Sequence, residues 1–270
     1  MLIAHITDTH ITAPGTLLMG IVDTASALER AVVALNRLDP PPDATVLTGD
    51  LVESGTPKEY AHLRALLAPL RMPIFAIPGN HDAREPMRDA FIGDGYLSRD
   101  GFLHYVIEAY PLRLVALDTL VEGEGGGVLC SDRLRWVDAI LAEAQDRPAL
   151  VLMHHPPFLT GIRRMDQAGL ADSAGFAEVI RGHPQVERIL CGHLHRPIET
   201  RFAGTVAGTA PSTAHQIVLD LRPKARLSFA FEPPGYQLHY WREGIGLVTH
   251  TAAIGDWPGP YFYSKMPATG

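Results

Sequence analysis

Side chains that can bind metal ions recur in this chain directly after short apolar runs. The candidates, in chain order, are Asp8, His10, Asp50, Asn80, His154, His193 and His195, with His81 beside one of them. Imidazole nitrogens and carboxylate oxygens in the absence of thiolates suit borderline transition ions such as zinc, iron, manganese and cobalt. The residue types therefore indicate a metal site assembled from distant parts of the chain.

The number of candidate ligands indicates how many ions they would hold. Seven side chains are too many for one tetrahedral ion, but they suit two ions that share a bridging carboxylate. Two ions about 3.5–4 Å apart can clamp the attacking and leaving oxygens of an in-line displacement and lower the pKa of a water molecule. Hydrolysis of a phosphate ester needs this help because its anionic oxygens repel an anionic nucleophile.

Each group of candidates has an ordinary structural explanation when it is taken alone. Asp8-Thr9-His10 could form a capped turn, Gly49-Asp50 a plain turn and Asn80-His81 a hydrogen-bonded loop, while His154 could be a packed core histidine. The segment Gly192-His193-Leu194-His195 is the strongest single signal, because alternation along the chain aims both imidazoles the same way. The coincidence of all five groups at equivalent strand ends favours a common site.

The apolar runs that precede these residues predict a largely parallel sheet. Strands are expected at residues 2–7, 44–48, 74–77, 102–108, 112–117, 149–153 and 186–191. Helical spacing of apolar residues between them predicts helices after Asp23, near Pro57 and from about Ser131. Since the functional crevice of an α/β sheet lies beyond the carboxyl ends of its strands, the candidate ligands should converge there.

The pattern changes after about residue 198. Short alternating runs at 216–221, 226–231, 237–241 and 246–251 predict antiparallel strands arranged as a meander. The aromatic side chains from Phe229 to Tyr263 either close the second sheet or form a self-association surface, and the sequence leaves both open. We interpret 1–270 as one domain, with a catalytic α/β body over about 1–197 and a mostly β part over about 198–270 that could carry an oligomerisation segment.

Composition and charge argue against nucleic acids and membranes as partners. The 270 residues carry a formal net charge of −7, which argues against nucleic acid as the main partner. No apolar run approaches the length of a membrane span, and the first residues lack the basic segment of a signal peptide. Two distant cysteines fit a reducing compartment. We therefore expect a cytoplasmic protein without membrane attachment.

The order of the motifs resembles a known family. Asp8-Thr9-His10, Gly49-Asp50, Gly79-Asn80-His81, His154 and Gly192-His193-Leu194-His195 follow one another as in the calcineurin-like metallophosphoesterases. The likeness is greatest to the class III cyclic-nucleotide phosphodiesterases and their bacterial glycerophosphodiesterase relatives. It implies an α/β fold (α+β), specifically a four-layer α-β-β-α sandwich of two mixed sheets flanked by helices. Relatives often form dimers or higher homo-oligomers.

The resemblance also implies a role for each candidate residue. Asp8, His10 and His195 would hold the first metal, Asp50 would bridge both, and Asn80, His154 and His193 would complete the second. His81 would lie near the scissile phosphate without binding metal and would act, with Asp50 and Asn80, in catalysis. Asn80, His81 and His195 would contact the substrate.

The implied activity is that of a dinuclear metal-dependent phosphodiesterase, in which a metal-held hydroxide attacks phosphorus in line. Its substrates would be small phosphodiesters, either 3′,5′-cyclic nucleotides such as cAMP or glycerophosphodiesters, with side activity toward phosphomonoesters and phosphonate monoesters. The alternative is a non-catalytic scaffold of the same fold that binds protein partners. Residues 157–172 could be a lid or a solvated connector, and His155 and His215 could support the ligands or simply pack.

Overall fold

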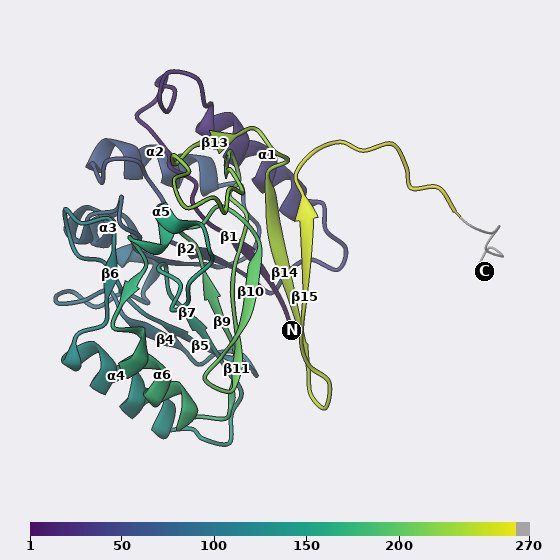
Figure 1. Ribbon diagram of the computed structural model, residues 1–270. Coiled ribbons are helices and arrows are strands. Elements are labelled where there is room, and N and C mark those ends of the chain that lie inside the picture. Colours follow the sequence, from purple (N-terminus) through teal and green to yellow (C-terminus); the bar gives the residue numbers. More distant parts are fainter. Residues whose placement is uncertain (263–270) are drawn as a thin grey trace, which may run out of the picture.

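Two β-sheets stacked face to face form the centre of the molecule, and helices cover the outer face of each (Figure 1). The computed structural model describes residues 1–262. The α-β-β-α sandwich that the family resemblance implies is confirmed, and both sheets are mixed.

The first sheet has five strands in the order β15-β14-β1-β2-β3. They are β1 (Leu2–Ile6), β2 (Ala44–Thr48), β3 (Ile74–Ile77), β14 (Gly235–Arg242) and β15 (Gly246–Ala253). β1, β2 and β3 are parallel, with Ile3 opposite Ala44 and Thr45 opposite Ile74. β14 and β15 add an antiparallel hairpin to the free side of β1.

The second sheet has six strands in the order β10-β11-β9-β7-β5-β4. They are β4 (Tyr105–Ile107), β5 (Arg113–Ala116), β7 (Ala149–Leu152), β9 (Val186–Cys191), β10 (Ile198–Phe202) and β11 (Thr205–Thr209). The four central strands are parallel and the two edge strands are antiparallel. Two small sheets pair β6 (Gly127–Val128) with β8 (Leu170–Ala171), and β12 (Gln216–Ile217) with β13 (Phe229–Ala230).

The described residues form six α-helices and one 3₁₀ turn, and the first two helices begin with side-chain caps. They are α1 (Thr24–Asn36), α2 (Pro57–Leu67), α3 (Arg84–Phe91), the short 3₁₀ turn η1 (Ile92–Asp94), α4 (Ser131–Ala142), α5 (Arg163–Asp166) and α6 (Ser173–Arg181). Asp23 caps α1 by accepting a hydrogen bond from the Ser26 amide at 3.0 Å. Thr56 and Glu59 form a reciprocal capping box at the start of α2.

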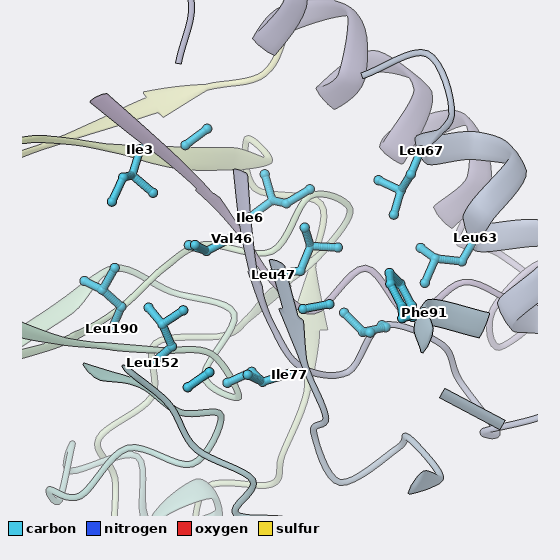
Figure 2. Close-up of a cluster of buried hydrophobic side chains, with 14 of the residues drawn as sticks. Ile3, Ile6, Val46, Leu47, Leu63, Leu67, Ile77, Phe91, Leu152 and Leu190 are labelled. Carbon is cyan, nitrogen blue, oxygen red and sulfur yellow. The ribbon is translucent and has the colours of Figure 1, made fainter. Parts of the chain in front are cut away.

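Alternation of side chains along the strands assigns each residue to one layer. In the second sheet Leu150, Leu152 and Leu190 face the first sheet, whereas Val151 and Ile189 face α4 and α6. Figure 2 shows the same division across the first sheet, with Leu47 toward Leu63 and Leu67 of α2 and Val46 toward Leu152. The burial of both faces explains why these strands read as continuous apolar runs.

The structure corrects several expected elements. The C-terminal strands do not form one antiparallel meander. The runs at 216–221 and 226–231 pair over only two residues each, as β12 and β13, whereas β14 and β15 extend the first sheet. β10 and β11 extend the second sheet, where β11 is parallel to β9. The strand expected at 102–108 is reduced to β4, and α3, α5 and α6 were not expected. Among residues 1–262, no helix is both long and apolar enough to cross a membrane. Tyr263, the last of the aromatic run, lies outside the described residues.

Candidate metal centre

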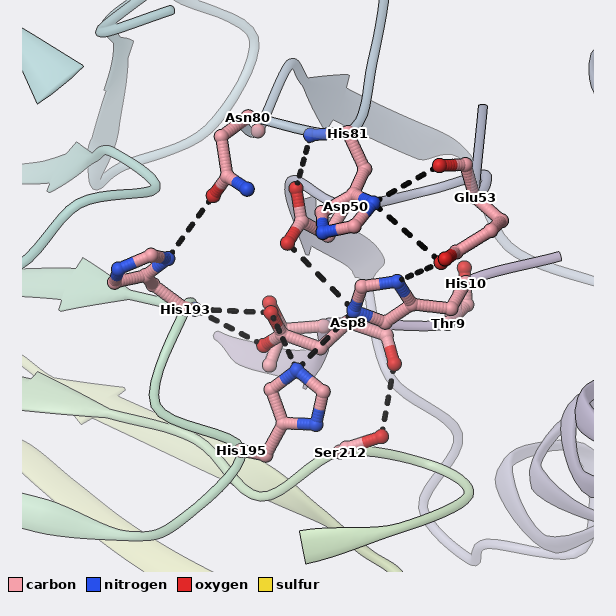
Figure 3. A network of polar contacts seen from close by, with 12 residues as sticks. Asp8, Thr9, His10, Asp50, Glu53, Asn80, His81, His193, His195 and Ser212 are labelled. Atoms are coloured by element: carbon pink, nitrogen blue, oxygen red, sulfur yellow. Dashed lines mark hydrogen bonds and ion pairs between the residues drawn. The ribbon is translucent and has the colours of Figure 1, made fainter. Parts of the chain in front are cut away.

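The candidate ligands meet where the carboxyl ends of the two sheets adjoin. Asp8 and His10 follow β1, Asp50 follows β2, and Asn80 and His81 follow β3 in the first sheet. His154 follows β7, and His193 and His195 follow β9 in the second. Figure 3 shows labelled side chains that follow strands of both sheets, such as Asp50 and Asn80 on one side and His193 and His195 on the other, directed into one space. The convergence expected at the strand ends is therefore present.

The backbone bends sharply at these residues. Of the eight non-glycine residues with positive φ in the described chain, five are candidate ligands, namely Asp8, His10, Asp50, His193 and His195. Such conformations cost of order 1–3 kcal/mol each and persist only where the surrounding structure enforces them. The strained backbone at the strand ends therefore orients the ligand side chains and lowers the free energy of unfolding.

Two glycines leave room for the ligands that follow them. A Cβ on Gly49, whose φ is +91°, would lie 2.5 Å from Nδ1 of His154. A Cβ on Gly79 would lie 2.8 Å from Cε1 of the same ring and would also clash with Asp50. The glycine that precedes Asp50 and the one that precedes Asn80 thus let the two sheets approach closely at the site.

Asp8, His10 and His195 form the first set of donors. Nε2 of His10 lies 3.1 Å from Nε2 of His195, which lies 3.4 Å from Oδ1 of Asp8. Nδ1 of His10 contacts Oε2 of Glu53 at 2.8 Å, and Nδ1 of His195 contacts the carbonyl oxygen of His215 at 3.1 Å. These acceptors assign the proton of each ring to Nδ1 and leave two Nε2 lone pairs facing each other. A positive charge, either an extra proton or a metal ion, has to lie between them.

Asn80, His154 and His193 form the second set. Oδ1 of Asn80 lies 3.1 Å from Nε2 of His154 and 3.0 Å from Nδ1 of His193. Nδ1 of His154 donates to the carbonyl oxygen of Thr48 at 2.7 Å, so its Nε2 also presents a lone pair. Nε2 of His193 is buried and has no hydrogen-bond partner within the described part of the chain.

Asp50 lies between the two sets. Its Oδ2 is 3.6 Å from Nε2 of His10 and 3.4 Å from Nε2 of His154, while its Oδ1 accepts a hydrogen bond from the His81 amide at 2.9 Å. One carboxylate thus contacts a histidine of each set. The donor types and their convergence fit two borderline metal ions that share this carboxylate.

The electrostatics of the cluster favour bound positive charge. Burial lowers the pKa of His154, but the charge of Asp50, a hydrogen bond to it and the charge of Asp8 outweigh burial and raise the pKa to about 9. The pKa of His10 is also raised, because hydrogen bonding to Glu53 and the charges of Asp50 and Asp8 outweigh burial. Burial holds the pKa values of His193 and His195 near 3, so both rings are neutral and available as ligands.

His81 lies at the edge of the cluster with 37% of its side chain exposed. Its Nδ1 contacts the carbonyl oxygen of Glu53 at 2.9 Å and the carboxylate Oε2 of the same residue at 3.4 Å. Glu53 therefore holds one side of the His81 ring, and the other side is open to the cleft.

Five of the seven donors line a cleft of about 270 Å³, namely His10, Asp50, Asn80, His193 and His195. Its walls are mostly apolar and come from separate segments: Leu18, Met19, Met165, Ile217 and Leu227. Residues 157–172 contribute Arg164, Met165 and Ala168 to the wall. This segment, expected as a lid or a connector, thus borders the cleft directly.

Sequence reasoning did not single out Glu53, which supports both His10 and His81. Ser212 was not named as a site residue either; its hydroxyl donates to the carbonyl oxygen of Asp8 at 2.8 Å. The two ambiguous histidines both adjoin the site. The ring of His215 lies 4.6 Å from that of His195, and the ring of His155 lies 4.8 Å from that of His193.

A two-sheet sandwich with clustered imidazole and carboxylate donors at the strand ends defines a class of metal-dependent hydrolases. The chain belongs to the calcineurin-like phosphoesterase family, whose model matches residues 1–197. The family expected from the order of the motifs is thereby confirmed, and with it a site for two metal ions.

Individual relatives cover nearly the whole chain. A protein of Arcobacter nitrofigilis named as a probable glycerophosphodiester phosphodiesterase, GpdQ, is 38% identical over 267 residues, or 98% of each chain. A probable cyclic nucleotide phosphodiesterase of Rhodopseudomonas palustris is 37% identical and covers 95% of this chain and 93% of its own. The crystal structure of a dimetal phosphatase from Danio rerio shares the fold, with a TM-score of 0.64 at 16% identity over 94% of this chain and 99% of that one.

Proposed function

We propose that this protein is a dinuclear metal-dependent phosphodiesterase that hydrolyses small phosphodiesters, either 3′,5′-cyclic nucleotides or glycerophosphodiesters. The observation that carries the proposal is the arrangement of seven donor side chains in two sets that share Asp50. The printed activities of the two bacterial relatives support the choice of a diester.

The residue roles follow the two sets. Asp8, His10 and His195 hold one metal ion, and Asn80, His154 and His193 hold the other. When bound, the ions neutralise charge on the phosphoryl oxygens and make hydroxide available near neutral pH. Asp50 contributes to both sites, so its charge offsets part of the charge of each ion.

His81 is proposed to act on the leaving group. The carbonyl oxygen and carboxylate of Glu53 both contact Nδ1, so Nε2 is the ring nitrogen left for the substrate. A proton on Nε2 can be donated to the departing alkoxide, as a general acid does. Asn80, His81 and His195 all line the cleft, which supports their proposed contact with substrate.

The cleft supports a small substrate. Its volume of about 270 Å³ and its apolar walls suit the alcohol portion of a single diester rather than a polymer. The net charge of −7 also disfavours a polyanion. Promiscuous turnover of phosphomonoesters and phosphonate monoesters stays a prediction of this mechanism, because the metal ions recognise the phosphoryl group more than the alcohol.

Self-association is part of the proposal. Beyond β15 the chain leaves the body of the molecule (Figure 1), and Trp257, Tyr261 and Phe262 are 63%, 82% and 81% exposed. Exposed aromatics on an extended segment support a homodimer or higher homo-oligomer. A cytoplasmic location, the division near residue 198 and a lid function for residues 157–172 stay predictions.

The test is a substrate panel with and without metal. Bis-p-nitrophenyl phosphate, cyclic AMP and glycerophosphocholine are assayed with metal-stripped protein and with the same protein reloaded with manganese. We expect turnover only after reloading. Equal rates before and after reloading would contradict the mechanism, and no turnover of any diester by metal-replete protein would favour the scaffold.

A further inference from the structure

A second concave surface adjoins the metal cleft and is lined by cations. We call it the basic basin; it has a volume of about 290 Å³ and is lined by Arg163, Arg164, Gln167, Pro223, Lys224 and Ala225. Arg164 lines both the basin and the metal cleft. One arginine therefore belongs to both surfaces, which places the basin at the rim of the site.

The cations of the basin are not neutralised by carboxylates. In residues 1–262, Arg163, Arg164 and Lys224 form no ion pair. Among the described residues, the guanidinium of Arg163 contacts only the carbonyl oxygen of Pro223, at 3.5 Å, and that of Arg164 only Oε1 of Gln167, at 3.4 Å. Both guanidinium groups thus keep most of their donors free.

Two acidic side chains beside the basin, Asp166 and Asp220, are engaged elsewhere. Asp166 accepts hydrogen bonds from the amide and hydroxyl of Thr160, both at 2.8 Å, and from the amide of Gly161 at 3.0 Å. Asp220 pairs with Arg222, whose Nε lies 2.9 Å from Oδ1. The positive charge of the basin is therefore available to a ligand.

Lack of pairing alone does not set the basin apart. Arg64 pairs with Asp94 and Arg196 with Glu232, both at 2.7 Å, but other exposed arginines, such as Arg181, form no ion pair within residues 1–262. The basin differs because three such cations line the same hollow. In a chain with a net charge of −7, three unpaired cations around one hollow form a local field that attracts anions. Guanidinium groups with free donors are well suited to phosphate.

We propose that the basic basin is a subsite for a second anionic group, a phosphate, carried by the alcohol portion of the diester substrate. The inference rests on the proposed function. The scissile phosphate lies at the metal donors, the middle of the alcohol lies along the apolar wall, and its pendant phosphate binds Arg163, Arg164 and Lys224. The preferred substrates are thus diesters with an additional phosphate, and cationic alcohols such as choline are disfavoured.

The wall between the two surfaces supports one ligand spanning both. Met165, next to Arg164, lines the metal cleft. Leu227 lines the cleft and also the shallow hollow that it shares with Arg163 and Arg164. An alcohol with an apolar or planar middle can therefore follow a continuous surface from the metal donors to the cations.

The test uses two chromogenic diesters that differ only in the pendant group. They are thymidine 5′-(p-nitrophenyl phosphate) with and without a 3′-phosphate, and the readout is the ratio of their kcat/KM values for the manganese-loaded enzyme. We expect the wild-type protein to favour the 3′-phosphorylated substrate by about fivefold or more, through KM, as the contacts of two or three partly exposed charges predict. The preference should decline with added salt because these charges are screened.

Variants of the basin arginines test whether the preference for the 3′-phosphorylated substrate comes from the basic basin. In R164Q, and more completely in R163Q/R164Q, the ratio should fall toward one through a higher KM for the 3′-phosphorylated substrate. Arg181→Gln, which removes an exposed arginine at the end of α6, is the matched control and should keep the wild-type ratio. An unchanged ratio in R163Q/R164Q would overturn the subsite.

The remaining outcomes distinguish failure of the phosphate subsite from failure of the proposed phosphodiesterase function. Release of p-nitrophenol from neither substrate would overturn the proposed function itself, whereas equal turnover of both by wild type would overturn the subsite alone. Sedimentation with phosphatidylglycerol vesicles serves as a second arm. Vesicle binding that depends on Arg163 and Arg164, without a preference between the two substrates, would assign the cations to a lipid surface and overturn the subsite.

Discussion

Two clusters of buried histidines in this molecule differ in how their ring nitrogens are satisfied. His5 and His239 lie on adjacent strands of the first sheet, with Nδ1 of His5 3.2 Å from Nε2 of His239. Their other nitrogens contact the hydroxyls of Thr48 and Thr249 at 2.8 and 2.9 Å. A hydroxyl can either donate or accept, so every nitrogen of this pair can be matched without added charge.

The cluster at the strand ends cannot be satisfied in that way. The Nδ1 atoms of His10, His154 and His195 all face oxygen acceptors, so the Nε2 lone pairs point at one another and at carboxylates. The difference reaches the pKa of two members of this cluster. Nearby carboxylates raise the pKa of His154 to about 9 and also raise that of His10 despite burial. Burial lowers the pKa of His5 to about 3, as it does for His193 and His195. Unmatched lone pairs, rather than burial, therefore distinguish a metal-binding histidine from a packed one.

The largest expected effect is that of Asp50→Asn, which removes the charge shared by both donor sets. The amide oxygen can still accept the His81 amide hydrogen bond, so we expect the fold to be retained. Metal content should fall from two ions to less than one, and kcat should fall on the order of 10³-fold or more. Metal analysis and turnover of bis-p-nitrophenyl phosphate check this; two bound ions in the variant would contradict the shared role.

A smaller loss is expected for Asn80→Ala, which removes a ligand from the second set only. Metal content should fall toward one ion, and kcat should fall about 10²-fold while the protein remains folded. Asn36→Ala is the matched control, since Asn36 binds the backbone of Pro69 and Arg71 far from the site. If both variants kept full activity, the second donor set would have no part in catalysis.

Glu53→Gln tests the acceptor that orients His10. The neutral amide can still meet Nδ1 of His10 but no longer offers a charge, so we expect metal affinity at the first set to weaken by roughly 10–100-fold. Titration of metal-stripped protein with manganese, followed by activity, measures the change. Glu199→Gln, on the exposed edge strand β10, should titrate like wild type, and a similar result for Glu53→Gln would remove this residue from the site.

The smallest effect concerns the His5–His239 pair and depends on pH. The pKa of His5 is about 3 in the folded protein against 6.5 for a free histidine, so the unfolded state binds the extra proton between these values. The free energy of unfolding should therefore fall as pH drops below about 6.5, by up to about 1.4 kcal/mol per pH unit for this group. His5→Gln should make that fall shallower.

Urea unfolding of metal-stripped protein at pH 7, 6 and 5 measures this slope. His250→Gln provides the control, because His250 is exposed in β15 and its loss should leave the slope as in wild type. If the free energy of unfolding had the same pH dependence in His5→Gln and wild type, the buried pair would tolerate a proton. The His5–His239 pair would then not differ from the strand-end histidines in the way argued above.

Local patterns were sufficient for much of the fold. The strands expected at 44–48, 74–77 and 186–191 match β2, β3 and β9 to the residue, because short apolar runs bounded by glycine or proline leave little choice of limits. α3 was not expected because half of its eight residues, Arg84 to Phe91, are charged and one is a proline. The addition of β14 beside β1 joins residues more than 230 positions apart, a pairing that no local pattern predicts.

The candidate site likewise contains residues that local patterns predict and residues that only the fold brings in. Asp8, His10, Asp50, Asn80, His154, His193 and His195 were predictable because each follows an apolar run and has a side chain that binds metal. Glu53 has the right chemistry but no such position, and its importance comes from a 2.8 Å contact with a residue more than forty positions earlier.

The sequence by itself determined which donors exist and that they follow strands, since ligand chemistry belongs to the residue type and alternation to the backbone. Only the tertiary structure decided which nitrogen of each imidazole keeps its lone pair, because that depends on acceptors such as Glu53, Thr48 and the carbonyl of His215. It also brought Arg163 and Arg164 beside Lys224, which lies on a separate loop. Charges that are far apart along a chain interact only after folding has set the distance between them.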